Sequence, residues 1–137
     1  AQKVPVTGSL IVTTPQDLAL LDAKKAVEMF HKVHVPVLGV VENMSVHVCS
    51  QCGHAEPIFG EGGGKSIADD YEADFLGALP LNLSIRLDAD AGLPSVAKDP
   101  ESHISSIYRE VARKLAANLW LRAKNSSAPL SIEISDD

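Results

Sequence analysis

The stretch "VPVLGVV", residues 35–41, decides the fold, because it contains no charged or hydrogen-bonding side chain over seven residues. A continuous apolar run, in place of an apolar-polar alternation, is typical of a strand buried on both faces of a parallel sheet. Two further short runs have the same character, "SLIVT" at residues 9–13 and "FLGALP" at residues 75–80. We therefore expect three parallel strands covered by helices.

The segments between and after these runs have helical periodicity. The first helix is expected to begin after Thr14 as its N-cap, with Pro15 in the first turn. A shorter helix is expected at residues 64–71, and a long amphipathic helix at residues 101–122. Strands that alternate with helices form right-handed βαβ units. The predicted fold class is α/β, a three-layer, mostly parallel sheet with flanking helices.

Composition limits the domain count and the partners. The chain has 137 residues, 45% of them hydrophobic, and a formal net charge of −6. We expect one domain over residues 1–124 and a polar, acidic tail over residues 125–137, either flexible or a loose edge strand. The twelve Lys and Arg residues are scattered, which argues against a nucleic-acid partner. Apolar runs are far shorter than the roughly 20 residues of a membrane-spanning helix, so no membrane partner is expected.

The sequence "HVCSQCGH", residues 47–54, has the strongest local signal for chemistry. Cys49 and Cys52 are the two cysteines of the chain, too few for a secreted disulfide scaffold, which favours a reducing, cytoplasmic location. Two thiolates three positions apart can bind one metal ion or one cluster together. An exposed turn with two idle thiols is the plain alternative.

Three metal or redox hypotheses compete for this pair. A zinc-binding interaction module would add His47 and His54 to Cys49 and Cys52, although four ligands within eight residues are crowded. A dithiol redox site needs its first cysteine at a helix N-terminus, and the residues around it predict a loop. An iron–sulfur cluster commonly takes four thiolates, so a second copy of the chain would supply the other two across a twofold axis.

A second candidate site lies at the carboxyl ends of the predicted strands. Asn43 follows the second strand, at the sheet edge where open α/β folds bind ligands. An amide there has the donor and acceptor that match an adenine edge, although an Asn after a strand is often only a turn former. The ends of the other strands, residues 13–14 and 80–82, are expected at the same edge.

Two other segments suggest motifs that fail. "FGEGGGKS", residues 59–66, resembles a phosphate-binding loop, but Phe59 stands where the pattern requires glycine and no buried strand precedes it. "LDADAG", residues 87–92, resembles half a calcium loop without its later glutamate and is predicted to be a polar turn. No catalytic residue is predicted, because no Ser-His-Asp arrangement or carboxylate pair is evident.

Four motifs together resemble those of one family. "TTPQD-ALLDAKK", "VPVLGVVENMS", C-x-x-C-G followed by "IFG-GGG", and "LPL-x-x-x-x-R" occur in the order and spacing of the Mrp/ApbC iron–sulfur cluster carrier ATPases, which are MinD/ParA-like. The resemblance runs from about Val4 to Leu121. It implies a deviant-Walker P-loop fold, a cytoplasmic homodimer, MgATP binding, and a 4Fe–4S cluster delivered to apo iron–sulfur proteins.

On this resemblance, Cys49 and Cys52 would bind the cluster between two subunits, and Asn43 would contact adenine, with Pro80 and Leu81 bordering the nucleotide. The family's Walker A loop and its D-x-P-P-G-T-G-D segment have no counterpart in the sequence. The chain is therefore expected to be the C-terminal part of a longer protein. Whether it is itself an enzyme stays open, because ATP hydrolysis depends on those segments.

Overall fold

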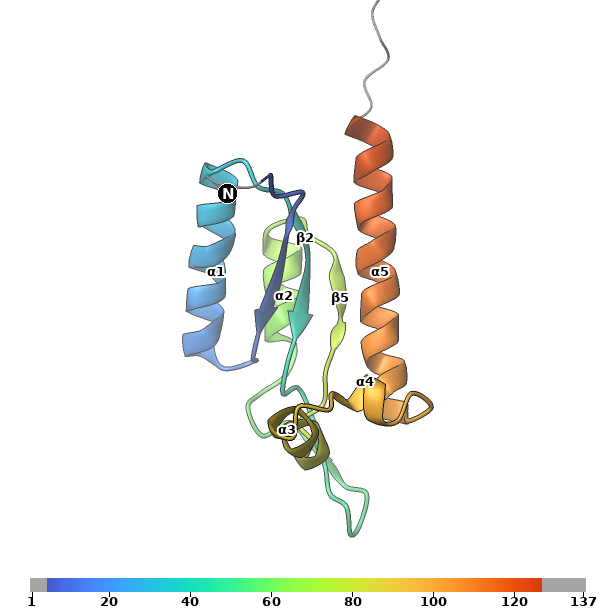
Figure 1. Ribbon diagram of the computed structural model, residues 1–137. Coiled ribbons are helices and arrows are strands. Elements are labelled where there is room, and N and C mark those ends of the chain that lie inside the picture. Colours follow the sequence, from blue (N-terminus) through green and yellow to red (C-terminus); the bar gives the residue numbers. More distant parts are fainter. Residues whose placement is uncertain (1–4, 127–137) are drawn as a thin grey trace, which may run out of the picture.

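The computed structural model describes residues 5–126 (Figure 1). Three strands form the main sheet, β1 (Ser9–Thr13), β2 (Val37–Glu42) and β5 (Phe75–Ala78), and two short strands form a hairpin, β3 (His47–Val48) and β4 (Ala55–Glu56). The helices are α1 (Asp17–Lys32), α2 (Gly63–Asp70), α3 (Leu83–Asp90), α4 (Ser95–Lys98) and α5 (His103–Ser126).

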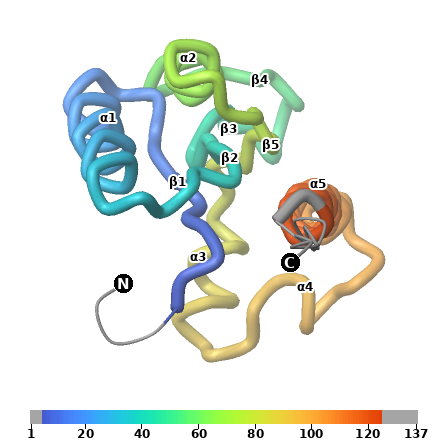
Figure 2. The backbone as a smooth tube through the Cα atoms, turned by 90° about the horizontal axis from the view of Figure 1, so that it is seen from above, coloured from blue at the N-terminus to red at the C-terminus, as the bar shows by residue number. Residues whose placement is uncertain are grey.

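The main sheet is parallel, with β2 between β1 and β5. All six residues of β2 are buried. Residues 37–41 belong to the apolar run that predicts this burial, and the sixth residue is the charged Glu42. Helices α1 and α2 pack on one face of the sheet and α5 packs on the other, which gives three layers (Figures 1 and 2). The predicted fold class is therefore confirmed, and the three predicted strands are present.

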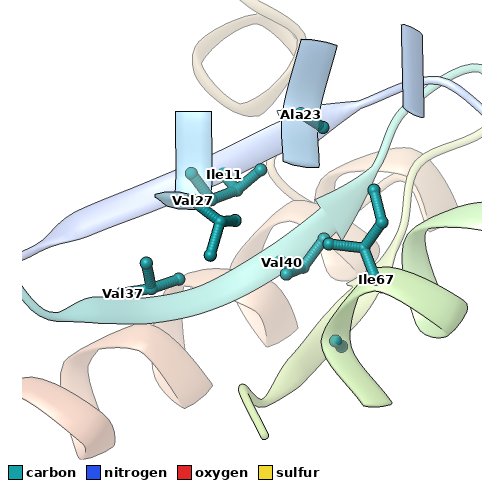
Figure 3. Packing of buried hydrophobic residues seen from close by; sticks show 7 residues of the cluster. Ile11, Ala23, Val27, Val37, Val40 and Ile67 are labelled. Carbon is teal, nitrogen blue, oxygen red and sulfur yellow. The ribbon is translucent and has the colours of Figure 1, made fainter. Parts of the chain in front are cut away.

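The larger part of the core lies between the sheet and helices α1 and α2. Val27, Val40 and Ile67 have no exposed surface, and they meet from one helix, the central strand and the other helix (Figure 3). Ala23 and Val27 are the buried positions of α1, four residues apart on one helical face. Burial of a side chain of this size contributes about 1.5–3 kcal/mol, so this cluster fixes how α1 and α2 lie on the sheet.

Helix α5 covers the opposite face of β2 and β5. A second cluster contains Val41, Leu76 and Leu79, against which partly buried side chains of α5 pack. Asn118 adds a polar link, since its Nδ2 donates to the Leu38 carbonyl at 2.9 Å and to the Asp74 carboxylate at 2.8 Å. Packing therefore attaches α5 to the carboxyl end of β2 and to β5, and the Asn118 hydrogen bonds attach it to the start of these two strands.

Two helix starts differ from the prediction. Helix α1 begins at Asp17 with Gln16 as its N-cap residue, so the predicted cap at Thr14 is wrong. The Thr14 hydroxyl donates to the Gln16 side chain at 2.8 Å and caps no amide. Helix α5 begins at His103, and Ser102 Oγ accepts from the Ser105 amide at 3.2 Å, the bond expected of a serine N-cap.

The predicted polar turn at residues 87–92 is also wrong, because Leu87 to Asp90 form the last turn of α3. Asp88 is buried there, with its carboxylate 2.6 Å from Lys98 Nζ and 3.2 Å from Ser95 Oγ. These bonds attach α3 to α4. The acidic pair Asp88 and Asp90 is thus structural, and Asp90 makes a surface pair with Arg86.

Helix α5 runs to Ser126, past the predicted domain boundary at residue 124. Residues 127–137 of the predicted tail lie outside the described residues. Among residues 5–126, no helix is both long enough and apolar enough to cross a membrane.

Candidate functional site

The carboxyl ends of the three parallel strands meet at one edge of the sheet. The Asn43 amide donates to the Thr13 carbonyl at 2.7 Å, and the Leu79 amide donates to the Glu42 carbonyl at 2.7 Å. Thr13, Asn43 and Leu79 therefore lie side by side, as their positions after the strands predict. This is the edge at which open α/β sheets bind ligands.

The side chain of Asn43 is half-buried at this edge. Its Oδ1 accepts from the Met44 amide at 2.9 Å, a contact that stabilises the left-handed backbone of Met44, which has φ 55°. Its Nδ2 has no hydrogen-bond partner among residues 5–126, so two donors are available to a ligand. Asn43 also lines an open cavity of about 550 Å³, together with Thr13 and Thr14.

Beyond Asn43, the chain stays paired with the segment that follows β5. The Ser45 amide and hydroxyl both donate to the Leu79 carbonyl at 3.0 Å, and the Leu81 amide donates to the Val46 carbonyl at 2.9 Å. His47 pairs in parallel with Leu81, and its ring Nδ1 lies 3.2 Å from the Leu81 carbonyl oxygen. We call these contacts of residues 45–47 with Leu79 and Leu81 the edge ladder.

The edge ladder leads directly into the β3–β4 hairpin, whose tip contains both cysteines. Across the hairpin the Cys49 amide donates to the His54 carbonyl at 2.9 Å, and the Gly53 amide donates to the Cys49 carbonyl at 2.9 Å. Gly53 has φ 72°, a backbone that glycine adopts without strain. Cys49 is half-buried and Cys52 is exposed, and both are free thiols.

The geometry of this turn favours the thiolate form of Cys49. The backbone N–H of Cys52, and next that of Gln51, point at the Cys49 sulfur and lower the pKa of its thiol, and the Cys52 side chain adds to the effect. Hydrogen bonds to a charged group stabilise that form over the neutral one. The thiolate is the form of cysteine that binds metals and acts as a nucleophile.

The other two hypotheses for the cysteine pair find less support. Among residues 5–126, no three His, Cys, Asp or Glu side chains gather closely enough to bind one metal ion, so His47 and His54 do not complete a zinc site with the cysteines. The ring Nδ1 of His47 also lies at hydrogen-bond distance from the Leu81 carbonyl oxygen, so this nitrogen already has a partner. A dithiol redox site requires a helix after the first cysteine, and Cys49 is followed by a turn.

The glycine-rich stretch is not arranged for phosphate. Gly64 lies in the first turn of α2, and its amide donates at 2.8 Å to the buried Glu42 carboxylate, so a negative charge already occupies the place an anion would take. Lys65 Nζ bonds both carboxylate oxygens of Asp69, at 2.9 and 2.7 Å. This agrees with the prediction that the phosphate loop motif is false.

The contacts of three residues in this region were not predicted from the sequence. They are Glu42 with Gly64, Ser45 with Leu79, and His47 with Leu81. Their hydrogen-bond partners lie 22 to 34 residues away along the chain, so no local sequence pattern indicates them. Pro80 and Leu81 lie at the predicted edge, but they do not line the cavity beside Asn43. Asn82 is the N-cap of α3, where its Oδ1 accepts from the Ser84 amide at 2.8 Å.

Comparison with known proteins identifies the family. The family described as "ParA: NUBPL iron-transfer P-loop NTPase" matches residues 1–116. The chain belongs to this ParA family. The resemblance drawn from the four sequence motifs is thereby confirmed, and the parallel sheet with flanking helices is the fold expected of a P-loop NTPase.

Curated relatives of this ParA-family chain have names that describe iron–sulfur chemistry. An "iron-sulfur cluster carrier protein" of Pseudomonas fragi is 64% identical over 112 residues, which is 82% of this chain and 39% of the relative. One of the same name from Escherichia coli K12 is 58% identical over 120 residues, 88% of this chain and 32% of the relative. The chain thus spans 32–39% of the length of these two relatives.

Among solved structures, a nucleotide-binding protein from Archaeoglobus fulgidus in complex with ADP superimposes with a TM-score of 0.57 at 32% identity. The superposition covers 70% of this ParA-family chain and 38% of that protein. The two proteins therefore share their fold over that portion of this chain.

Proposed function

We propose that this chain is the cluster-binding part of an iron–sulfur cluster carrier. Cys49 and Cys52 bind a 4Fe–4S cluster as cargo, the same two residues of a second copy complete its ligands, and the homodimer delivers the cluster to apo iron–sulfur proteins. The observation that carries this proposal is the exposed hairpin tip that places two free cysteines in one turn, with the Cys49 thiolate favoured by backbone N–H groups.

The number of ligands supports the homodimer. A four-iron cluster commonly takes four thiolates, and each chain contains two cysteines. In a twofold dimer the same surface of each copy meets its equivalent, so two hairpin tips would face each other and supply the set. The names of the relatives support the cargo, and the exposure of the tip supports its transfer.

We also propose that ATP binds at the sheet edge in the intact protein. The free Nδ2 of Asn43 would donate to adenine, and the backbone of Pro80 and Leu81 would border the nucleotide. Residues 5–126 contain no phosphate loop suited to the triphosphate or to Mg²⁺, because Gly64 and Lys65 have other partners. ATP hydrolysis is therefore a proposal about the intact carrier.

A reducing compartment suits this chemistry. Cluster binding needs both cysteines as thiolates, and a cytoplasmic location keeps them from forming disulfides. We accordingly propose a cytoplasmic carrier that acts without nucleic acid or a membrane.

The direct test is anaerobic reconstitution of the chain with iron and sulfide. Iron content, visible absorbance and oligomer mass are read on the same sample. We expect a brown dimer with about one four-iron cluster per two chains, the ratio that two thiolates per chain require. A colourless monomer would contradict the proposal, and zinc at one per chain would favour the zinc module instead.

Variants assign the ligands. Cys49→Ser, Cys52→Ser and the double variant should each lose the cluster absorbance and the dimer, whereas Ser50→Ala, a change between the two cysteines, should retain both. A double variant that still contained a full cluster would exclude these residues as ligands.

A further inference from the structure

The β3–β4 hairpin has few contacts with the rest of the chain. Residues 50–58 are all exposed, so burial contributes little to the orientation of the hairpin tip. The residues that connect the hairpin to the sheet are those of the edge ladder. Ser45 is buried, and Val46 and His47 are half-buried. The position of Cys49 relative to the sheet is therefore set by the ladder.

Within the edge ladder, His47 is the last residue before the hairpin tip that bonds to the sheet edge. Its Nδ1 lies 3.2 Å from the Leu81 carbonyl oxygen. A backbone carbonyl only accepts hydrogen bonds, so Nδ1 must be the donor and bear a proton. The neutral ring is thus fixed in the Nδ1–H tautomer, and its plane is fixed with it.

The partner of His47 belongs to the segment that borders the proposed nucleotide site. Leu81 is bonded twice to the ladder, through its amide to Val46 and through its carbonyl to His47. Leu79, two residues earlier, is bonded to Ser45 and to Glu42. The residues before the cysteines and the residues after β5 are therefore joined by hydrogen bonds along residues 45–47.

We propose that His47 is a positioning residue, which holds the cysteine hairpin against residues 79–81 and thereby couples the cluster ligands to the sheet edge. The coupling to a cluster rests on the proposed function, whereas the positioning of the hairpin does not. A ligand that displaces Leu81 displaces the ring of His47, and with it Cys49 two residues later.

The chain contains a matched control for His47. His54 lies on the other arm of the same hairpin, is exposed, and its ring has no hydrogen bond with any of residues 5–126, although its carbonyl accepts from Cys49. His47→Ala and His54→Ala therefore remove the same ring from the two arms of one hairpin. His47→Asn is the conservative variant, because the Asn amide can donate from a position similar to that of Nδ1.

Amide hydrogen exchange measures the docking directly. In His47→Ala we expect the Leu81 amide to exchange about five-fold faster, the change that corresponds to the loss of a hydrogen bond of about 1 kcal/mol. The Cys49 amide, bonded within the hairpin, and the Val40 amide, bonded within the sheet to Asp74, should exchange at their original rates. Faster exchange at Leu81 alone would mean that the hairpin is detached from the sheet edge, whereas faster exchange at Cys49 as well would mean that the hairpin itself is unfolded.

Two comparisons complete the amide experiment. His54→Ala should leave the Leu81 rate unchanged, and His47→Asn should restore most of the original protection. Ring nitrogen chemical shifts of the unsubstituted chain should show the neutral His47 with its proton on Nδ1. A proton on Nε2, or equal Leu81 exchange in the two alanine variants, would overturn the proposal.

Cluster lability gives the functional readout. On a reconstituted carrier, His47→Ala should lose iron to a chelator about five-fold faster than His54→Ala, in line with the loss of the same bond. Equal rates would refute the coupling. If the unsubstituted chain binds no cluster, the proposed function fails, and the amide and ring measurements still decide whether His47 positions the hairpin.

Discussion

The carboxylate of Glu42, at the end of β2, accepts a hydrogen bond of 2.8 Å from the amide of Gly64, in the first turn of α2. Glu42 is 3% exposed, so this charge is buried at the positive end of a helix. The bond ties the start of α2 to the strand end that precedes Asn43. It also places a carboxylate at the helix terminus where a phosphate group would otherwise accept from the Gly64 amide.

Removal of this carboxylate should destabilise the fold. In Glu42→Ala the Gly64 amide loses its partner in a buried setting, which costs about 1–3 kcal/mol of the free energy of unfolding. Glu42→Gln keeps an oxygen that can accept and should cost about 1 kcal/mol, for the lost charge at the helix terminus. Urea unfolding of both variants tests the order. An equal effect of the two would mean that the charge, and not the acceptor oxygen, accounts for the loss, whereas a Gln variant as stable as the unsubstituted chain would mean that the charge itself does not matter.

Gly64 should tolerate no side chain. A Cβ at this position would lie 2.8 Å from Glu42 Cβ and 3.3 Å from Glu42 Cα, atoms of a strand that cannot turn away. We expect Gly64→Ala to lower the free energy of unfolding by about 1–3 kcal/mol, as overpacking does. Lys65→Ala, at the next and exposed position, is the control, and it should unfold close to the unsubstituted chain in the same urea titration.

The pair of Asp88 and Lys98 should make stability depend on acid pH. The Lys98 hydrogen bond lowers the pKa of the Asp88 carboxyl, and although burial opposes this, Ser95 and the charge of Lys98 add to it. A lowered folded-state pKa stabilises the protein above the unfolded value, about 3.9 for Asp, and the benefit is lost as the pH falls through the folded-state pKa.

Thermal unfolding across a pH series tests this pair. The gap in melting temperature between the unsubstituted chain and Asp88→Asn should be largest above about pH 5 and should shrink below about pH 4. Asp90→Asn, which removes an exposed partner of Arg86, is the control and should give only a small gap. A gap for Asp88→Asn that stays constant down to low pH would contradict the assigned cause.

Cys49 should react as a thiolate at lower pH than an ordinary thiol. In Cys52→Ser the backbone N–H of residue 52 is retained, so the main cause of the lowered Cys49 pKa persists. The alkylation rate of Cys49 should therefore reach half its maximum below about pH 8.5, the ordinary cysteine value. The same variant in concentrated urea is the control. An identical profile with and without urea would show that the turn has no effect on the thiol.

The three strands could be predicted because their signal is local. Residues 35–41 are apolar without alternation, and the structure buries this strand on both faces. The start of α1 could not be predicted from Thr14, since the threonine side chain bonded to Gln16 instead of an amide. The sequence does contain typical cap residues on both sides of α3, Asn82 before it and Gly92 after it. The two aspartates between them suggested half a calcium loop and obscured this helix signal.

The candidate site was predicted only in part. The cysteine pair is recognisable from spacing, and Asn43 from its place after a strand. The hairpin that presents the cysteines is made of strands two residues long, too short for any periodicity. Glu42 and His47 act through Gly64 and Leu81, at distances of 22 and 34 residues along the chain. Such contacts depend on the folded sheet.

The hydrogen bond from Asn118 to the Leu38 carbonyl spans 80 residues of sequence, and this has a consequence for the order of biosynthesis. At about 5–20 residues per second, a ribosome needs roughly 4–16 seconds to add those residues. During that interval the α5-facing side of the nascent sheet, with Leu76 and Val41, has no helix to cover it. The nascent chain therefore exposes this apolar face of the sheet to solvent until α5 has been translated.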